Sequence, residues 1–214
     1  MMLRPETADL AAYLGADEVI DHQHPELRRL AAELATPEAA FHHVRDQVAH
    51  SADAGAYSGA FRASEVLAAR NAICHGKSHL LAALLRAQGL PAGLCYQRLE
   101  DGEGGFVLHA LNAVHLDGRW SRLDARGNRE GVDTRYDLER ERLAWPVRPE
   151  LGERDYPGVF AAPPAPLLRA LARAVPGRSG YGHLPAELPG EPEPGPIGFG
   201  LPTPSPAGPG SSSA

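Results

Sequence analysis

The sequence is poor in cysteine and has no long apolar run. It has 2 cysteines among 214 residues, Cys74 and Cys95. These are too few for a disulfide framework, and we expect both to be free thiols in a reducing compartment. No stretch approaches the roughly 18 consecutive apolar residues of a membrane span, and the first residues contain no apolar segment of signal-peptide length. These absences predict a soluble, cytoplasmic protein with no membrane partner.

Positive charge is also scarce. The chain has 21 Lys and Arg against 27 Asp and Glu, for a formal net charge of -6, and Lys77 is its only lysine. A protein that binds nucleic acid by neutralising phosphates needs a basic face, so we expect no nucleic-acid partner. Hydrophobic residues make up 43% of the chain and charged residues 22%, which is ordinary for a globular protein.

Apolar periodicity and turn residues divide the chain into a domain over residues 1–175 and a tail over residues 176–214. The tail is rich in Pro, Gly and Ser and is expected to be disordered. The domain is expected to place helices before an antiparallel sheet, which is an α+β organisation. Helices are predicted within 26–50, over 63–70, after Cys74 and over 165–174, and strands over 93–99, 106–116 and 119–125.

Cys74 lies at the start of a predicted buried helix, whose apolar stripe includes Leu80, Leu81, Leu84 and Leu85. The unpaired N–H groups and the dipole of a helix start favour a thiolate. Lowering a thiol pKa from about 8.5 to about 5 requires roughly 5 kcal/mol, whereas a helix terminus supplies at most ~2 kcal/mol. A neighbouring imidazolium is therefore needed to activate Cys74. Cys95, in an apolar strand, is expected only to pack in the core.

A predicted hairpin offers that imidazole together with a carboxylate. Asp117-Gly118 between two apolar runs is a strong signal for a two-residue turn. This register places His109 and Asp124 on one face of the sheet as a diagonal pair, roughly 7–8 Å apart at the backbone. A slip of one residue would put them on opposite faces. The three residues then match an activated nucleophile, its base and the group that orients the base.

Four segments carry a resemblance to a known family. They are FHHVRDQVAH (41–50), ASEVL (63–67), ICHGKSHLLAALLRAQGLPA (73–92) and HALNAVHLDGRWSRLD (109–124). In this order the chain resembles the transglutaminase-like superfamily, in its bacterial stand-alone form. The resemblance implies a papain-like α+β fold in which the cysteine-bearing helix packs on an antiparallel sheet. It also implies that Cys74, His109 and Asp124 are the nucleophile, the base and the orienting acid.

The expected reaction is attack of the Cys74 thiolate on an amide or ester carbonyl to give a thioester. Water then releases the acyl group in hydrolysis, or an amine takes it in transfer. A peptide or protein amide is the expected substrate, and no cofactor is expected. The superfamily also contains inactive members, so the alternative is a non-catalytic scaffold that binds a peptide or protein partner in the cleft.

The remaining histidines allow a third interpretation. His75 and His79 are one helical turn apart, a spacing that can bind zinc with Cys74 or Cys95 as a further ligand. We favour a simpler assignment in which His75 lines the cleft and His79 lies on a helix face. We expect the last group, His42, His43 and His50, to lie on the surface near a helix end.

Overall fold

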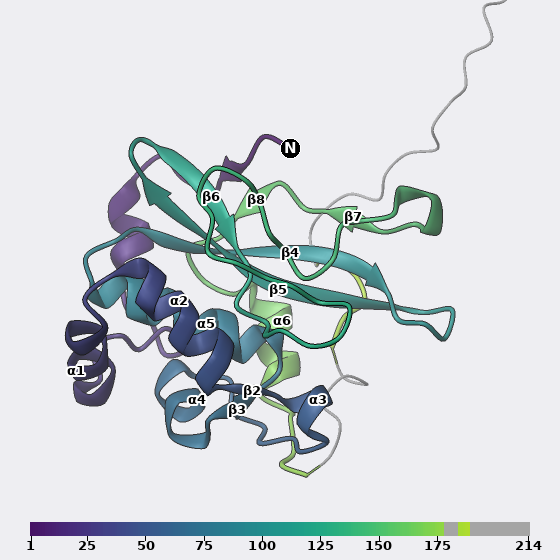
Figure 1. Cartoon of the computed structure of the whole chain (residues 1–214), viewed down its shortest axis with the longest axis horizontal. Helices are drawn as coiled ribbons and strands as arrows, with labels where there is room; N and C mark the ends of the chain where they lie inside the picture. Colours follow the sequence, from purple (N-terminus) through teal and green to yellow (C-terminus); the bar gives the residue numbers. More distant parts are fainter. Residues whose placement is uncertain (178–183, 189–214) are drawn as a thin grey trace, which may run out of the picture.

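The computed structural model describes residues 1–177 and 184–188. Its centre is a four-stranded antiparallel sheet with the strand order β6-β5-β4-β7. Helices gather against this sheet, with α5 (Cys74–Ala87) lying along it and several of the others packed around α5 (Figure 1). The strands of the sheet are β4 (Ala92–Glu100), β5 (Phe106–Leu116), β6 (Arg119–Leu123) and β7 (Arg154–Asp155).

The helices begin and end where local sequence signals allow. Pro25 and Pro37 open α1 and α2, where the missing N–H costs no helical hydrogen bond. The Thr36 hydroxyl accepts a bond of 3.1 Å from the Ala39 N–H and caps α2. The helices are α1 (Pro25–Leu34), α2 (Pro37–Gln47), α3 (Ser51–Ala54), α4 (Ala63–Ala69), α5 (Cys74–Ala87) and α6 (Ala165–Leu171), with 3-10 turns at Leu10–Leu14 and Pro149–Leu151.

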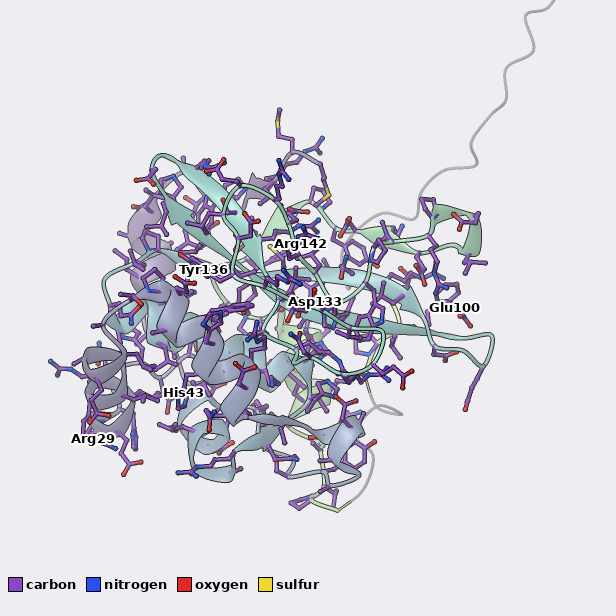
Figure 2. All side chains as sticks on the ribbon, in the orientation of Figure 1. Arg29, His43, Glu100, Asp133, Tyr136 and Arg142 are labelled. Atoms are coloured by element: carbon purple, nitrogen blue, oxygen red, sulfur yellow. The ribbon has the colours of Figure 1, made fainter. Side chains whose placement is uncertain are left out.

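Helix α5 is the core of the helical layer. Its leucines are fully buried, and it packs against α1, α2 and α4 on one side and against β4 and β5 on the other. Asn112 of β5 ties the helix to the sheet, because its side-chain amide donates a 2.9 Å bond to the Ser78 carbonyl. Tyr136, labelled in Figure 2, lies in the loop after β6 and packs on α2, with its ring centroid 5.9 Å from that of Phe41.

Two short parallel pairs join distant segments. β1 (Arg4–Pro5) pairs with β8 (Gly158–Val159), and β2 (Ala49–His50) pairs with β3 (Asn71–Ala72). In the second pair His50 lies opposite Ala72, two residues before the start of α5. Neither pair was predicted, because each depends on a contact between segments remote in sequence.

The predicted hairpin register is confirmed. Leu116 pairs with Arg119, and the ladder continues back to Asn112 opposite Leu123. Asp117 and Gly118 both have positive φ, 50° and 79°, as a type I′ turn requires. Asp124 follows directly after β6, so the strand pairing fixes where its side chain starts.

The α+β prediction is confirmed, since the helix that begins at Cys74 packs on an antiparallel sheet. Most of the tail predicted to be disordered, 176–214, lies outside the described residues, and the domain boundary stays a prediction. Within that tail, residues 184–188 pack on the domain: Leu188 is buried, and Glu187 pairs with Arg154 at 2.5 Å. In the described part of the chain, no helix has the length and apolar character needed to cross a bilayer.

Candidate active site

Cys74 is the first residue of α5. Its position follows from the extended backbone of Ile73, the residue that caps the helix. The first bond within the helix runs from the Lys77 N–H to the Ile73 carbonyl at 3.1 Å, so the preceding N–H groups of the first turn remain free of helical bonds. Cys74 is 6% exposed. The thiol therefore lies almost buried at the positive end of a helix dipole.

His109 and Asp124 lie in direct contact. His109 Nε2 is 2.9 Å from Asp124 Oδ2, and both side chains are buried. Because a carboxylate only accepts hydrogen bonds, Nε2 carries the proton, which leaves Nδ1 to face another group. The carboxylate is held in turn by two backbone N–H groups, those of Ala144 at 2.9 Å and Arg126 at 3.0 Å. Trp145 packs edge-on against the His109 ring at 5.2 Å.

The charged forms of Cys74, His109 and Asp124 stabilise one another. Burial raises the pKa of the Cys74 thiol, but the charge of His75 and hydrogen bonds with His109, His50 and His75 bring it well below its ordinary value. Burial disfavours a charged His109, yet the carboxylate of Asp124 and the contact with Cys74 raise the pKa of His109 to about 10. Burial likewise raises the pKa of Asp124, but His109 and two N–H donors lower it overall. The arrangement favours a thiolate beside an imidazolium.

The structure thus brings together the three residues predicted from sequence. It also places two further histidines at the sulfur. His75 Nδ1 is 3.4 Å from Cys74 Sγ, and His50 makes a side-chain contact with the same thiol. The surface position expected for His50 is wrong, because this residue is 7% exposed. The pairing of His50 with Ala72 turns it inward beside the start of α5, and no local pattern signals such a pairing.

Two buried cations, Lys77 and Arg126, bind groups in the segments next to the site. The ammonium of Lys77 donates to the carbonyls of Val48 and Arg45 at the end of α2. Burial and then the charge of Arg126 lower the pKa of Lys77 to about 8. Arg126 itself binds both oxygens of Asp53. These contacts hold the segments that carry His50 and Asp124 against α5.

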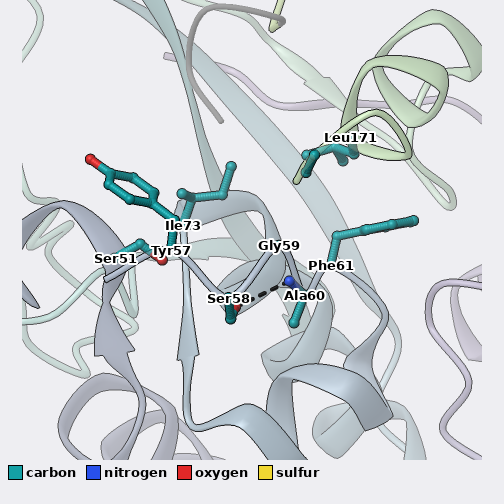
Figure 3. A pocket seen from close by; sticks show the side chains of 9 residues that line it. Ser51, Tyr57, Ser58, Gly59, Ala60, Phe61, Ile73 and Leu171 are labelled. Atoms are coloured by element: carbon teal, nitrogen blue, oxygen red, sulfur yellow. Dashed lines mark hydrogen bonds between the residues drawn. The ribbon is translucent and has the colours of Figure 1, made fainter. Parts of the chain in front are cut away.

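A small hollow lies at the segment that precedes α5 (Figure 3). Ile73, the neighbour of Cys74, lines it together with Tyr57, Phe61 and Leu171. The Ser58 hydroxyl fixes its floor by accepting a 3.1 Å bond from the Ala60 N–H. The hollow is small, with room for about one water molecule, and its walls are mainly apolar.

The His79 ring bonds a main-chain carbonyl instead of the thiol. Its Nδ1 lies 2.7 Å from the Phe61 carbonyl, and burial lowers its pKa to about 4. Among residues 1–177 and 184–188, no group of three histidine, cysteine or acidic side chains is arranged to hold a metal ion. The zinc interpretation thus gains no support from His75 and His79.

Comparison with known proteins gives a family. Residues 26–125 match the transglutaminase-like superfamily, and this stretch includes Cys74, His109 and Asp124. No curated protein matches the sequence significantly.

Solved structures with similarity to the chain include a "Putative Cysteine Protease from Cytophaga hutchinsonii", at 20% identity and a TM-score of 0.48, covering 56% of this chain and 43% of that one. The periplasmic domain of TgpA from Pseudomonas aeruginosa is 19% identical with a TM-score of 0.38, covering 56% of this chain and 48% of that one. A protein named as a TGase is 21% identical with a TM-score of 0.36, covering 56% of this chain and 34% of that one. The chain thus spans less than half of each. Residues 26–125 thus resemble the transglutaminase-like superfamily.

Proposed function

We propose that this protein is a thiol enzyme that takes an acyl group from an amide or ester and passes it to water or to an amine. Cys74 is the nucleophile, His109 the proton carrier and Asp124 the group that orients His109. One observation carries the proposal: the His109 imidazole lies 2.9 Å from the Asp124 carboxylate and close enough to the Cys74 thiol for each of the two to shift the pKa of the other. That is the arrangement an activated nucleophile needs.

In the first step, the Cys74 sulfur attacks the carbonyl carbon and forms a C–S bond. The C–N or C–O bond of the substrate breaks as the His109 imidazolium gives its proton to the leaving group. The free N–H of Cys74 at the start of α5 is placed to donate to the carbonyl oxygen as it becomes negative. The products of this half-reaction are a thioester on Cys74 and a free amine or alcohol.

In the second step, neutral His109 takes a proton from water or from an amine, which attacks the thioester carbon. The C–S bond breaks and leaves the Cys74 thiolate beside the His109 imidazolium, as at the start. The released product is a carboxylic acid after attack by water or a new amide after attack by an amine. We propose peptide or protein amides as acyl donors.

One observation favours the second candidate, a non-catalytic scaffold. Cys74 and His109 are 6% and 3% exposed, so a substrate carbonyl reaches the sulfur only if the covering segments open. A scaffold would keep the site closed and bind its partner elsewhere on the cleft. The two candidates differ in whether a thioester forms on Cys74.

Trapping this thioester is the decisive experiment. The full chain is mixed with an activated aryl ester and, separately, with a library of glutamine- and asparagine-containing peptides, quenched in acid and measured by intact mass. We expect an added acyl mass on Cys74, absent from Cys74→Ala and retained in Cys95→Ala. Adding a primary amine then distinguishes transfer from hydrolysis. No acyl mass with any donor, in protein whose Cys74 is alkylated by iodoacetamide, would favour the scaffold.

A further inference from the structure

More histidine side chains surround Cys74 than the proposed reaction requires. His109 contacts the Cys74 thiol from β5, His50 from β2, and His75 from the next position of α5. The reaction requires one base, and His109 fills that role because Asp124 orients it. His50 and His75 therefore have no assignment, although both are buried.

His75 has the better-defined contact of the two. Its Nδ1 lies 3.4 Å from Cys74 Sγ, and the residue is 0% exposed. Its other ring nitrogen, Nε2, is buried and has no hydrogen-bond partner within the described chain. Tyr96, whose ring centroid lies 6.3 Å away, also has a buried hydroxyl without a partner. Among the residues that the structure describes, the sulfur is thus the one polar group that the His75 ring contacts at hydrogen-bond distance.

The direction of this contact follows from the chemistry of sulfur. A thiolate has no proton and can only accept, so a bond to it requires Nδ1–H on His75. A hydrogen bond to the charged form of an acid favours that form. His75 is built into the first turn of α5, whose dipole acts in the same sense. The contact also fixes the sulfur, because the two side chains leave adjacent positions of one helix.

We propose that His75 is a positioning residue that donates Nδ1–H to Cys74 and holds its thiolate form independently of His109. This inference rests on the proposed function, since it divides the tasks of that site between two imidazoles. His109, bonded to Asp124, moves the proton, while His75 keeps the sulfur charged and in place. Loss of His109 then removes turnover but leaves a reactive thiolate.

The groups around the sulfur agree with this division. After burial, which raises the thiol pKa, the charge of His75 is the strongest influence on Cys74 and acts to lower it. The other titratable groups that face the thiol are His79 on α5, Tyr96 on β4, His50 on β2 and His109 on β5. Of these, His109 is bonded to Asp124 and His79 to the Phe61 carbonyl, whereas His75 is the neighbour of Cys74 in α5.

The test is the pH profile of alkylation at Cys74. A Cys95→Ala background removes the second thiol, and mass spectrometry assigns the adduct from iodoacetamide. In this background, His75→Leu removes the donor at similar size, whereas His75→Asn keeps an N–H near the Nδ1 position. His109→Asn removes the proton carrier. His79→Asn is the matched control, because it alters a buried histidine of the same helix that bonds the Phe61 carbonyl instead of Cys74.

We expect the alkylation midpoint to rise by at least about one pH unit in His75→Leu, which slows the reaction about tenfold below the midpoint. His75→Asn should recover part of this shift. His109→Asn should lose turnover while its midpoint stays below that of an ordinary cysteine, and His79→Asn should match the parent protein. Thermal unfolding of each variant verifies that Cys74 is measured in folded protein, and partial recovery in His75→Asn separates loss of the donor from loss of packing.

Two results would overturn the proposal. One is a midpoint that reaches the ordinary cysteine value in His109→Asn, or in a His50→Gln variant, while His75→Leu leaves it unchanged. The other is an equal rise in His75→Leu and His79→Asn. Neither result depends on a substrate. Failure to trap a thioester would therefore remove the proposed function and leave the alkylation profiles to judge His75 separately.

Discussion

The two cysteines of this chain are both buried, yet their surroundings are opposite. Cys74 begins α5 among three imidazoles. Cys95 lies inside β4, opposite Leu111 and packed with Tyr13 and Val159. Burial raises the pKa of Cys95 to about 12, with Arg122 only partly opposing it, whereas the histidines around Cys74 lower its pKa despite the same burial.

The difference teaches that burial does not decide whether a thiol is reactive; its partners do. A buried thiolate is stable only where donors or positive charges replace the water it has lost. The start of α5 supplies N–H groups and imidazoles within reach. The middle of β4 supplies neither, because its backbone groups are bonded to β5 and its neighbours are apolar.

The largest expected effect is on the catalytic rate, which should depend on Cys74 and not on Cys95. Cys74→Ala should lower acyl release from an activated ester by at least about ten-thousandfold, because the nucleophile is lost. Cys95→Ala should leave the rate within a few-fold, since Cys95 touches no reacting group. Steady-state rates on the two purified variants test this, and a comparable loss in both would break the comparison.

The next effect concerns the carboxylates near each cysteine. Asp124→Asn should reduce turnover about a hundred- to ten-thousandfold. Burial already lowers the pKa of His109, and the charge of Asp124 is what raises it to about 10. Without that charge His109 loses its proton at lower pH, so the alkaline decline in rate should move to lower pH.

Asp155 is the matched control for Asp124. It pairs with Arg122 at 2.5 Å near Cys95, where Glu141 also binds Arg122. Asp155→Asn should therefore leave both the rate and the pH profile close to wild type. If the alkaline decline in rate moved to lower pH in both variants, general charge rather than the bond to His109 would set the profile.

A third effect needs no substrate. At neutral pH, iodoacetamide should alkylate Cys74 at least about a hundredfold faster than Cys95, because the thiolate fraction rises as the thiol pKa falls and only Cys74 has a lowered pKa. In denaturant the two rates should become similar. Peptide mass spectrometry over a time course gives the alkylation rates of Cys74 and Cys95. Equal rates in the folded protein would contradict the pKa difference.

The smallest effect is on stability and compares two tightly packed glycines. A Cβ on Gly76 would lie 2.8 Å from the Ala72 Cβ, and one on Gly93 would meet Val159. Each Gly→Ala change should lower the free energy of unfolding by about 1–3 kcal/mol through overpacking, as measured by chemical denaturation. Only Gly76→Ala should also shift the alkylation profile of Cys74, because Ala72 pairs with His50 beside the thiol. A shift in Gly93→Ala instead would show that the two regions are coupled.

Sequence predicted those parts of the site that depend on local pattern. The position of Cys74 follows from helix signals, and the meeting of His109 with Asp124 follows from the register that Asp117-Gly118 sets. These predictions succeed because a two-residue turn fixes the pairing of both strands.

What sequence missed depends on contacts between remote segments. His50 turns inward only because β2 pairs with β3. Ala144, which donates to Asp124, belongs to a segment without regular period. Likewise, Leu188 is buried although it lies in a stretch whose composition indicates a tail. Tertiary packing decides such residues, and periodicity carries no signal for them.

The burial of Lys77 has a practical use. It is the single lysine of the chain, it is 1% exposed, and its ammonium is bound to carbonyls at the end of α2. An amine-acetylating reagent therefore has one lysine to modify in this chain, and it reaches that lysine only when α2 separates from α5. The rate at which Lys77 is acetylated, followed by peptide mass spectrometry, would then report how often the helices packed around α5 separate.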